Sequence, residues 1–157
     1  MSERGTTRRR ATRKIVVATD FSAASRRAFS AALDLARRDG ARLVVLHVMM
    51  PPSPFGDDLP GSWIELEARA RRDAERRLAA AVSQAERARI ATTSTLVKGA
   101  PAEVIVRVAR REGADLIVIG THGRSGLGRL FMGSVAARVL GTAMCPVLTV
   151  RGRGRKA

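Results

Sequence analysis

A glycine-rich stretch between Asp115 and Val135 carries the residue types that bind phosphate. A run of aliphatic residues precedes the glycines, and helical spacing resumes after the last of them. A buried strand, a glycine loop and a helix, in this order, direct backbone N–H groups and the positive end of a helix dipole at an anion. Ser134, in the first turn of the expected helix, adds a side-chain donor. The glycines are Gly120, Gly123, Gly126, Gly128 and Gly133.

Asp20 is the second candidate group. It ends the β-branched run from Lys14 to Thr19, which predicts a short strand, and Ser22 behind it is a residue type that caps helices. Two interpretations of Asp20 are open, and they are compatible with each other. Its carboxylate accepts hydrogen bonds from the ribose or adenine of a nucleotide, or it caps the helix that follows.

Five strands and four helices alternate along the chain and must position these groups. Such alternation predicts an α/β fold, with a parallel sheet covered by helices on both faces. Ligands of these sheets bind beyond the carboxyl ends of the strands, where strand order reverses. The orders 2-1-3-4-5 and 3-2-1-4-5 both bring Asp20 near a later loop, so we predict a nucleoside phosphate site between Asp20 and Gly120. The strands are expected at 14–19, 42–48, 91–97, 116–119 and 145–150, and the helices from Ala24 to Gly40, from Trp63 to Arg89, from Pro101 to Gly113 and after Gly133.

Two segments carry more specific expectations. The segment 49–62 contains four prolines and is predicted to be neither strand nor helix. In the long helix after it, Ile64 begins the stripe expected to face the core. The threonine-rich strand at 91–97 is expected at a sheet edge. The ion pairs expected on the long helix are Glu67 with Arg71 and Asp73 with Arg77.

The net charge of +15 is concentrated at the two ends of the chain. Residues 1–14 carry six basic residues and one acidic residue, and residues 151–157 carry four basic residues. Basic tails attract polyanions in a salt-dependent way, whereas the simpler interpretation is that they are solvated ends. No apolar run approaches the ~18 residues of a membrane span, and a single cysteine excludes an internal disulfide. We therefore expect a cytoplasmic protein without membrane contact.

The remaining reactive side chains are interpreted as structural. His122 lies in the glycine loop without a second acid or nucleophile beside it in sequence, and His47 lies in an apolar strand, as a hydrogen-bonded core histidine does. Cys145 is read as a small buried apolar residue. Met49 and Met50 leave two alternatives open, which are covering a bound adenine or closing the core.

Neither of two common phosphate motifs occurs in the glycine stretch. The Walker A motif fails because no Gly-Lys-Ser/Thr is present, and the dinucleotide motif G-x-G-x-x-G fails after Gly128. The pattern that fits is Gly120, two residues, Gly123, nine residues, then Gly133 and Ser134. With its surroundings, it resembles the ATP-binding branch of the universal stress protein family. The similar segments are VVATDFS at 16–22, LHV at 46–48, KGAPAEVIV at 98–106, GADLIVIGTHGRSGLGRLFMGSVAARVL at 113–140 and CPVLTVR at 145–151.

This resemblance implies a fold and a ligand. The fold is a three-layer sandwich of the flavodoxin-like or adenine nucleotide alpha-hydrolase-like type, with four helices on a five-stranded parallel sheet of order 3-2-1-4-5. Residues 14–151 would form the universal stress protein domain. The basic tails at 1–13 and 152–157 have no counterpart in the family pattern, and we expect them to be disordered from their composition alone. The resemblance further implies a homodimer through the strand Pro146 to Val150, and ATP with Mg²⁺ on its phosphates.

The resemblance also implies a set of ATP-binding residues. Adenosine contacts would fall after the first two strands, ribose contacts after the fourth, and phosphate contacts along the loop and the helix behind it. Ala18 stands where some family members have proline, a change small enough to keep the pocket. The implied residues are Ala18, Thr19, Asp20, Val48, Gly120, Thr121, Gly123, Arg124, Gly133, Ser134 and Val135.

Together these observations predict a nucleotide-dependent regulator or sensor in the stress response. We expect no catalytic residue and no metal held by protein side chains, because no triad or general base is visible beside the loop. Two alternatives stay open. One is a nucleic-acid or polyanion binder that uses the basic tails, and the other is a slow ATPase.

Overall fold

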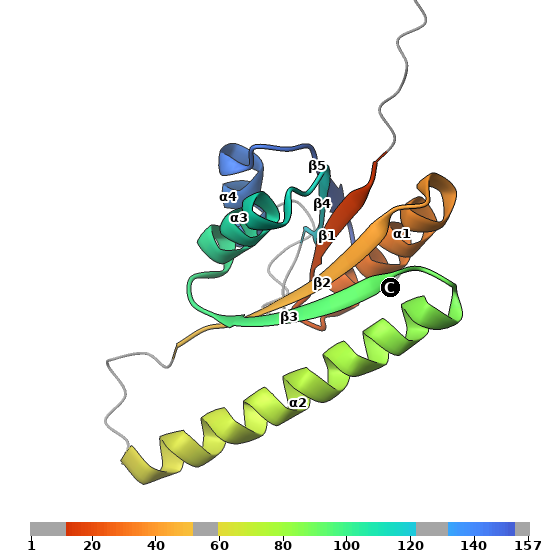
Figure 1. Cartoon of the computed structure of the whole chain (residues 1–157). Coiled ribbons are helices and arrows are strands. Elements are labelled where there is room, and N and C mark those ends of the chain that lie inside the picture. Colours follow the sequence, from red (N-terminus) through yellow and green to blue (C-terminus); the bar gives the residue numbers. More distant parts are fainter. Residues whose placement is uncertain (1–11, 52–59, 122–131, 153–157) are drawn as a thin grey trace, which may run out of the picture.

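The computed structural model describes residues 12–51, 60–121 and 132–152, and the side chains of residues 60–62 are left out (Figure 1). The elements alternate along the chain as expected. The strands are β1 (Lys14–Ala18), β2 (Arg42–Met49), β3 (Thr92–Lys98), β4 (Leu116–Gly120) and β5 (Val147–Val150). The helices are α1 (Ala23–Asp39), α2 (Pro60–Arg87), α3 (Pro101–Glu112) and α4 (Ser134–Thr142).

All strand pairs in the sheet are parallel, and the strand order is β3-β2-β1-β4-β5. This confirms the order 3-2-1-4-5 and excludes 2-1-3-4-5. The central strand β1 pairs with β2 on one side and with β4 on the other. The threonine-rich β3 lies at one edge, as predicted, and β5 lies at the other.

Helices cover both faces of the sheet and make a three-layer sandwich (Figure 1). Ile15 and Val17 of β1 point to one face, where they pack with residues of α1 and α2 such as Phe29 and Leu78. Val16 and Ala18 point to the other face, where α3 and α4 cover them. Because successive side chains of a strand alternate between faces, β1 is buried on both sides and reads as a continuous apolar run.

The ends of α1 and α3 follow from local chemistry. The Ser22 side chain accepts a hydrogen bond from the N–H of Ser25 and caps α1. Gly40 and Gly113 end α1 and α3 with φ of 64° and 61°. This left-handed conformation is open to glycine and closes a helix by satisfying its last carbonyl groups.

Helix α2 differs from the sequence prediction at its N-terminal end. It begins at Pro60, so the last residues of the proline-rich segment 49–62 are helical, and Met49 belongs to β2; residues 52–59 lie outside the described part. Proline is tolerated in the first turn of a helix, where its missing N–H is not needed. The prediction that Ile64 faces the core is wrong, because its surface is 71% exposed.

One of the two ion pairs expected on α2 forms, and the other is replaced by a contact with the end of β3. Asp73 pairs with Arg77 at 2.7 Å, as predicted. Glu67 does not pair with Arg71. It contacts Lys98 at the end of β3, with 2.7 Å between Nζ and Oε1. The helix therefore passes the end of β3 near Glu67, and Ile64 lies beyond the strand that would have buried it.

In the described residues, no helix combines the length and the apolar character needed to cross a membrane.

Candidate functional site

The carboxyl ends of β1 and β4 lie side by side, as predicted. In the register of the two strands Ala18 is opposite Ile119, so Thr19 and Asp20 leave the sheet next to Gly120 and Thr121. On the other side of β1, the Thr19 N–H donates to the Leu46 carbonyl of β2 at 2.8 Å. The edge of the sheet at this point therefore brings together three of the segments expected to contact adenosine and ribose.

The carboxylate of Asp20 is ionised at neutral pH, and one of its oxygens is hydrogen-bonded within the turn that follows β1. Its Oδ1 accepts a hydrogen bond from the Ser22 N–H at 3.0 Å. Burial raises the pKa of Asp20, but hydrogen bonds from Ser22 and Ser25 outweigh this effect and leave the pKa below its ordinary value. The helix cap itself is Ser22. Asp20 thus supports the start of α1 indirectly and keeps a negative charge at the strand end.

The residue after Asp20 has an unusual backbone. Phe21 has a φ of 62°, in the left-handed region that bulky residues avoid. Such a conformation costs on the order of 1–3 kcal/mol and persists only where the surroundings impose it. Here the Phe21 N–H donates to the Thr19 hydroxyl at 3.0 Å, and the Phe21 carbonyl accepts from the Arg26 guanidinium at 2.8 Å.

The Phe21 ring is held by residues of two other elements. The ring of His47 in β2 lies 4.6 Å from it, centroid to centroid, at an interplanar angle of 35°. The guanidinium of Arg77 in α2 lies 5.4 Å from the ring centroid. His47 Nδ1 is 2.7 Å from the Thr19 carbonyl oxygen, which can only accept, so Nδ1 carries a proton. His47 is half-buried and hydrogen-bonded, in line with its sequence interpretation.

Gly120 is required by packing, independently of any ligand. A Cβ atom at this position would lie 2.9 Å from the Ala24 carbonyl carbon and 3.0 Å from the Ser25 nitrogen. Both are backbone atoms at the start of α1, which cannot move as a flexible side chain does. The absence of a side chain at Gly120 therefore lets the first turn of α1 pack directly on the end of β4.

Backbone hydrogen bonds place the start of α4 at the same edge of the sheet. Thr121, which is buried, donates its N–H to the Val150 carbonyl at 2.9 Å and accepts at its carbonyl from the Gly133 N–H at 2.5 Å. Gly133 precedes α4 and provides no side-chain cap. The first turn of α4, with Ser134 and Val135, thus begins beside the end of β4 with N–H groups that Gly133 does not cap.

The structure therefore places most of the predicted site residues around one edge. Ala18 ends β1, and Thr19 and Asp20 follow it. Val48 lies in β2, Gly120 ends β4 and Thr121 follows it. Gly133 precedes α4, and Ser134 and Val135 begin it. Gly123 and Arg124, together with His122, Gly126 and Gly128, lie outside the described residues. The phosphate-binding role of that loop stays a prediction.

Sequence comparison identifies the family to which this arrangement belongs. A sequence model described as the universal stress protein family matches residues 11–151. The chain belongs to the universal stress protein family. This establishes the resemblance suggested by the segments around Asp20 and Gly120.

Curated relatives support the same family over nearly the whole chain. The chain is 36% identical over 140 residues to universal stress protein MJ0531 of Methanocaldococcus jannaschii, covering 88% of the chain and 82% of that protein. It is 39% identical over 137 residues to a universal stress protein of Thermus aquaticus, covering 87% of the chain and 97% of that protein.

Solved structures of similar fold include proteins with bound nucleotides. The hypothetical protein MJ0577 superposes with a TM-score of 0.81 at 26% identity, over 92% of this universal stress protein and 99% of MJ0577. A universal stress protein in complex with cAMP has a TM-score of 0.65 at 30% identity, over 91% and 99% of the two chains. One from Archaeoglobus fulgidus in complex with dAMP has a TM-score of 0.62 at 27% identity, over 89% and 98%.

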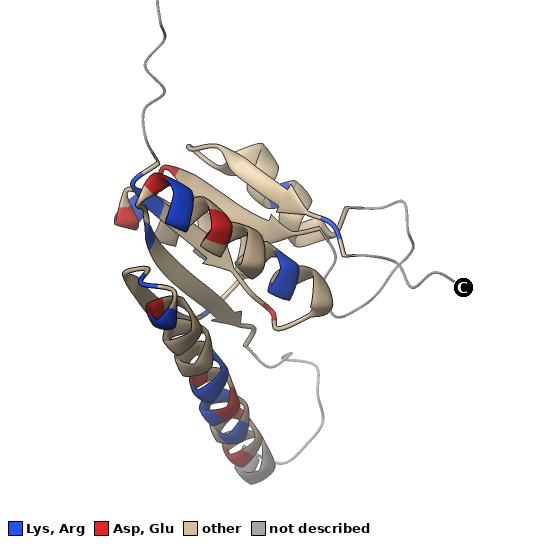
Figure 2. Cartoon of the chain, turned by 90° about the vertical axis from the view of Figure 1, so that its right-hand side faces the viewer, with Lys and Arg blue, Asp and Glu red and all other residues tan. Residues whose placement is uncertain are grey.

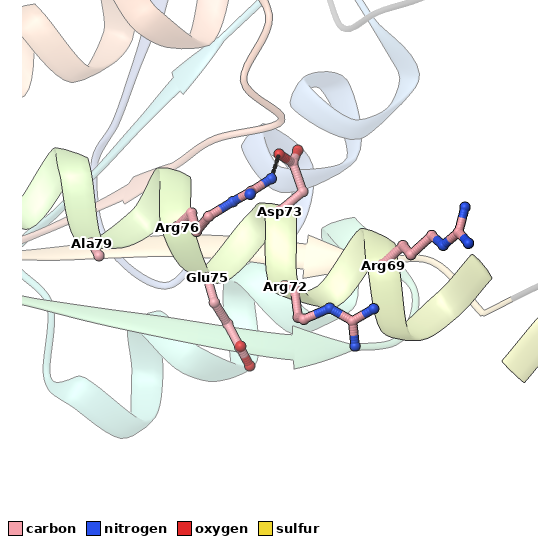
Figure 3. A pocket seen from close by; sticks show the side chains of 6 residues that line it. All are labelled: Arg69, Arg72, Asp73, Glu75, Arg76 and Ala79. Atoms are coloured by element: carbon pink, nitrogen blue, oxygen red, sulfur yellow. Dashed lines mark hydrogen bonds and ion pairs between the residues drawn. The ribbon is translucent and has the colours of Figure 1, made fainter. Parts of the chain in front are cut away.

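A hollow on the surface of this universal stress protein is lined by residues of α2. Figure 3 shows an open hollow whose lining residues, including Arg69, Arg72 and Asp73, all come from α2. Acidic and basic residues alternate along this helix (Figure 2). The hollow is therefore part of a solvated helix face, with no contribution from the strand ends. Within residues 12–51, 60–121 and 132–152, no three His, Cys, Asp or Glu side chains are grouped to hold a metal ion.

Sequence reasoning missed two parts of the site. The left-handed Phe21 and its contacts with His47 and Arg77 join three elements, but no sequence pattern predicts that an aromatic residue adopts a positive φ. The packing role of Gly120 was also missed. The sequence does contain a signal for this role, because a glycine at the end of a buried strand often marks a place where another backbone approaches closely.

Proposed function

We propose that this universal stress protein binds ATP and acts as a nucleotide-dependent regulator or sensor in the stress response. One observation carries the proposal. The strand pairing of β1 and β4 brings the ionised Asp20 to the same edge as the start of α4, where Gly133 donates to Thr121. A carboxylate and a helix N-terminus at one edge suit the two ends of a nucleotide.

The chemistry of the two groups is complementary to that of ATP. An ionised Asp20 accepts hydrogen bonds from a ribose hydroxyl or from the adenine amino group. The N–H groups and the dipole at the start of α4 favour phosphate, and the Ser134 hydroxyl adds a donor. Ser134 is exposed and therefore accessible to a ligand. The described residues thus fit a nucleotide whose sugar lies near β1 and whose phosphates lie near α4.

The solved relatives support an adenine nucleotide as the ligand. Both cAMP and dAMP combine adenine with a phosphate, and they were found on proteins of this fold at 30% and 27% identity. The preference for ATP over these monophosphates rests on the spacing of Gly120, Gly123, Gly133 and Ser134, which resembles that of the ATP-binding branch of the family. Mg²⁺ would bind through the phosphate oxygens, as it commonly does in ATP sites.

We infer a binding protein rather than an enzyme because no triad or general base is visible in the sequence beside the glycine loop. A general base works best when its pKa lies near the working pH, and the pKa of Asp20 is lower than that of an ordinary aspartate. Asp20 is therefore better suited to accept hydrogen bonds than to remove a proton. A slow ATPase is the competing proposal, and it requires turnover that falls more than affinity when Asp20 or Ser134 is replaced.

We also propose a homodimer through β5 and a cytoplasmic location. β5 is an edge strand, and the carbonyl groups of Pro146 and Val150 accept hydrogen bonds from N–H groups of Ile117 and Thr121. Because backbone groups alternate in direction along a strand, the Thr149 N–H points away from β4, toward the open edge. An edge of this kind favours pairing with a second copy.

Thermal unfolding with and without Mg-ATP tests the proposed function. At a nucleotide concentration 100-fold above Kd, binding stabilises the native state by about 2.7 kcal/mol, which raises Tm by about 5–11 °C for a chain of this size. In the Asp20→Asn variant a hydrogen bond to a charged group is weakened, and we expect Kd to rise by about 10- to 100-fold. GTP serves as the control for base recognition. No shift in Tm at millimolar ATP would refute the proposal.

A further inference from the structure

The turn that carries Asp20 is held by contacts from three separate elements. Phe21 accepts at its carbonyl from Arg26 of α1, and its ring lies against His47 of β2 and under the guanidinium of Arg77 of α2. His47 also contacts the Thr19 carbonyl, on the other side of Asp20. The unfavourable φ of Phe21 depends on these surroundings, because the residue type alone disfavours it.

Asp20 depends on Phe21 through the backbone. The Asp20 carboxylate accepts from the Ser22 N–H, two residues along the chain, so the φ of the intervening Phe21 sets where that N–H points. If Phe21 relaxed to a negative φ, the Ser22 N–H would turn away and the carboxylate would lose this one of its hydrogen bonds. The direction of the Asp20 side chain is therefore tied to the position of the Phe21 ring.

The guanidinium of Arg77 joins helix α2 to this turn, beside the apolar cluster against which Phe21 packs. Arg76 and Arg77 both pair with Asp73, at 3.0 and 2.7 Å, but Arg77 is the one that lies over the Phe21 ring. The Arg77 side chain is 48% exposed and that of Arg76 is 78% exposed. The two residues are neighbours with the same charge and the same acidic partner, and they differ in the contact with Phe21.

We propose that Phe21 is a positioning residue for the nucleotide and that Arg77 couples α2 to the nucleotide site through it. This inference rests on the proposed function, since it concerns how Asp20 is presented to the ligand. Coupling between two sites is reciprocal, so a ligand that holds Asp20 in place also holds Phe21 and Arg77. A change in the position of α2 would in turn alter nucleotide affinity.

Nucleotide titration of matched arginine variants tests the coupling. Arg77→Met removes the cation over the ring and keeps an unbranched apolar side chain, and Arg76→Met is its control, because Asp73 keeps one arginine in each. Loss of a partly exposed cation–π contact is expected to raise the Kd for Mg-ATP by about two- to fivefold in Arg77→Met. Arg76→Met is expected to bind as the wild type does, and Arg77→Lys, which keeps a cation, is expected to bind more tightly than Arg77→Met.

Two further measurements separate positioning from a merely structural role. Phe21→Gly accepts the positive φ without strain but removes the ring, so we expect a cooperatively folded protein with Kd raised more than in Arg77→Met. Amide hydrogen exchange around Arg77 is expected to slow when nucleotide binds to the wild type, and to change less in Phe21→Gly.

The outcomes distinguish this inference from the proposed function. If the wild type does not bind nucleotide, the proposed function fails and the inference fails with it. If the wild type binds but Arg77→Met and Phe21→Gly bind equally well, the inference alone is overturned. Equal losses in Arg76→Met and Arg77→Met would also overturn it, because charge near the site would then explain the effect without Phe21.

Discussion

Replacing Gly120 by alanine tests whether this glycine serves packing as well as the site. The added Cβ would lie 2.9 Å from the Ala24 carbonyl carbon, 3.0 Å from the Ala24 Cβ and 3.0 Å from the Ser25 nitrogen. Contacts this short force backbone or helix movement, and overpacking of a well-packed region typically costs about 1–3 kcal/mol. We therefore expect the free energy of unfolding of the nucleotide-free protein to fall by about that amount.

Gly141→Ala is the matched control for this variant. Gly141 lies near the end of α4, and a Cβ there would meet nothing within 4 Å. Alanine is a better helix former than glycine, so this variant is expected to gain up to about 1 kcal/mol in the free energy of unfolding. The change from glycine to alanine is thus predicted to lower the free energy of unfolding at position 120 and to raise it at position 141.

Urea denaturation without nucleotide, followed by tryptophan fluorescence and circular dichroism, measures both changes. A loss of about 2 kcal/mol in Gly120→Ala corresponds to a fall in Tm of about 4–8 °C for a chain of this length. The packing argument would be refuted if Gly120→Ala were as stable as the wild type without nucleotide and lost only nucleotide binding. Gly120 would then serve the ligand alone.

Three further predictions concern Asp20, the β5 edge and the tails. Because the pKa of Asp20 is depressed in the folded state, its contribution to stability is full above the unfolded pKa of about 3.9 and is lost as pH falls through the folded pKa. Urea titrations should therefore show a smaller loss of stability in Asp20→Asn at pH 3 than at pH 7, and an equal loss at both would contradict this. Thr149→Pro removes the outward N–H of β5, and light scattering should show monomers where the wild type gives dimers; a monomeric wild type would rule the dimer out. Deletion of 1–13 and 152–157 should abolish salt-sensitive retention on heparin and leave Kd for ATP unchanged, whereas retention that persists would place the polyanion contact in the body of the protein.

Much of the fold is predictable from the sequence because each element carries its own signal. The aliphatic runs of β1, β2 and β4 predict strands buried on both faces, and Gly40 and Gly113 mark helix ends. Alternating strands and helices restrict the connections to right-handed crossovers, which places every strand's carboxyl end at one edge. The sequence therefore predicts that Asp20 and Gly120 lie close together, although they are far apart in the chain.

Other features depend on tertiary surroundings that no local pattern encodes. The periodicity of α2 predicts which face carries Ile64, but whether that face is buried depends on where β3 ends, and the contact of Glu67 with Lys98 marks that point. The positive φ of Phe21 likewise results from contacts with β2 and α2, which are distant in sequence. The exposure of Ile64 and the positive φ of Phe21 can therefore be predicted only when the packing of the helices on the sheet is known.

The central claim is that the turn after β1 and the start of α4 bind one nucleotide together. Titration of ¹⁵N-labelled protein with Mg-ATP, followed by amide NMR, measures both regions in the same sample. We predict that the amides of Thr19–Ser22 and those of Gly133–Ala136 shift along the titration with one common Kd. Shifts confined to one of the two regions, or two different Kd values, would contradict the claim.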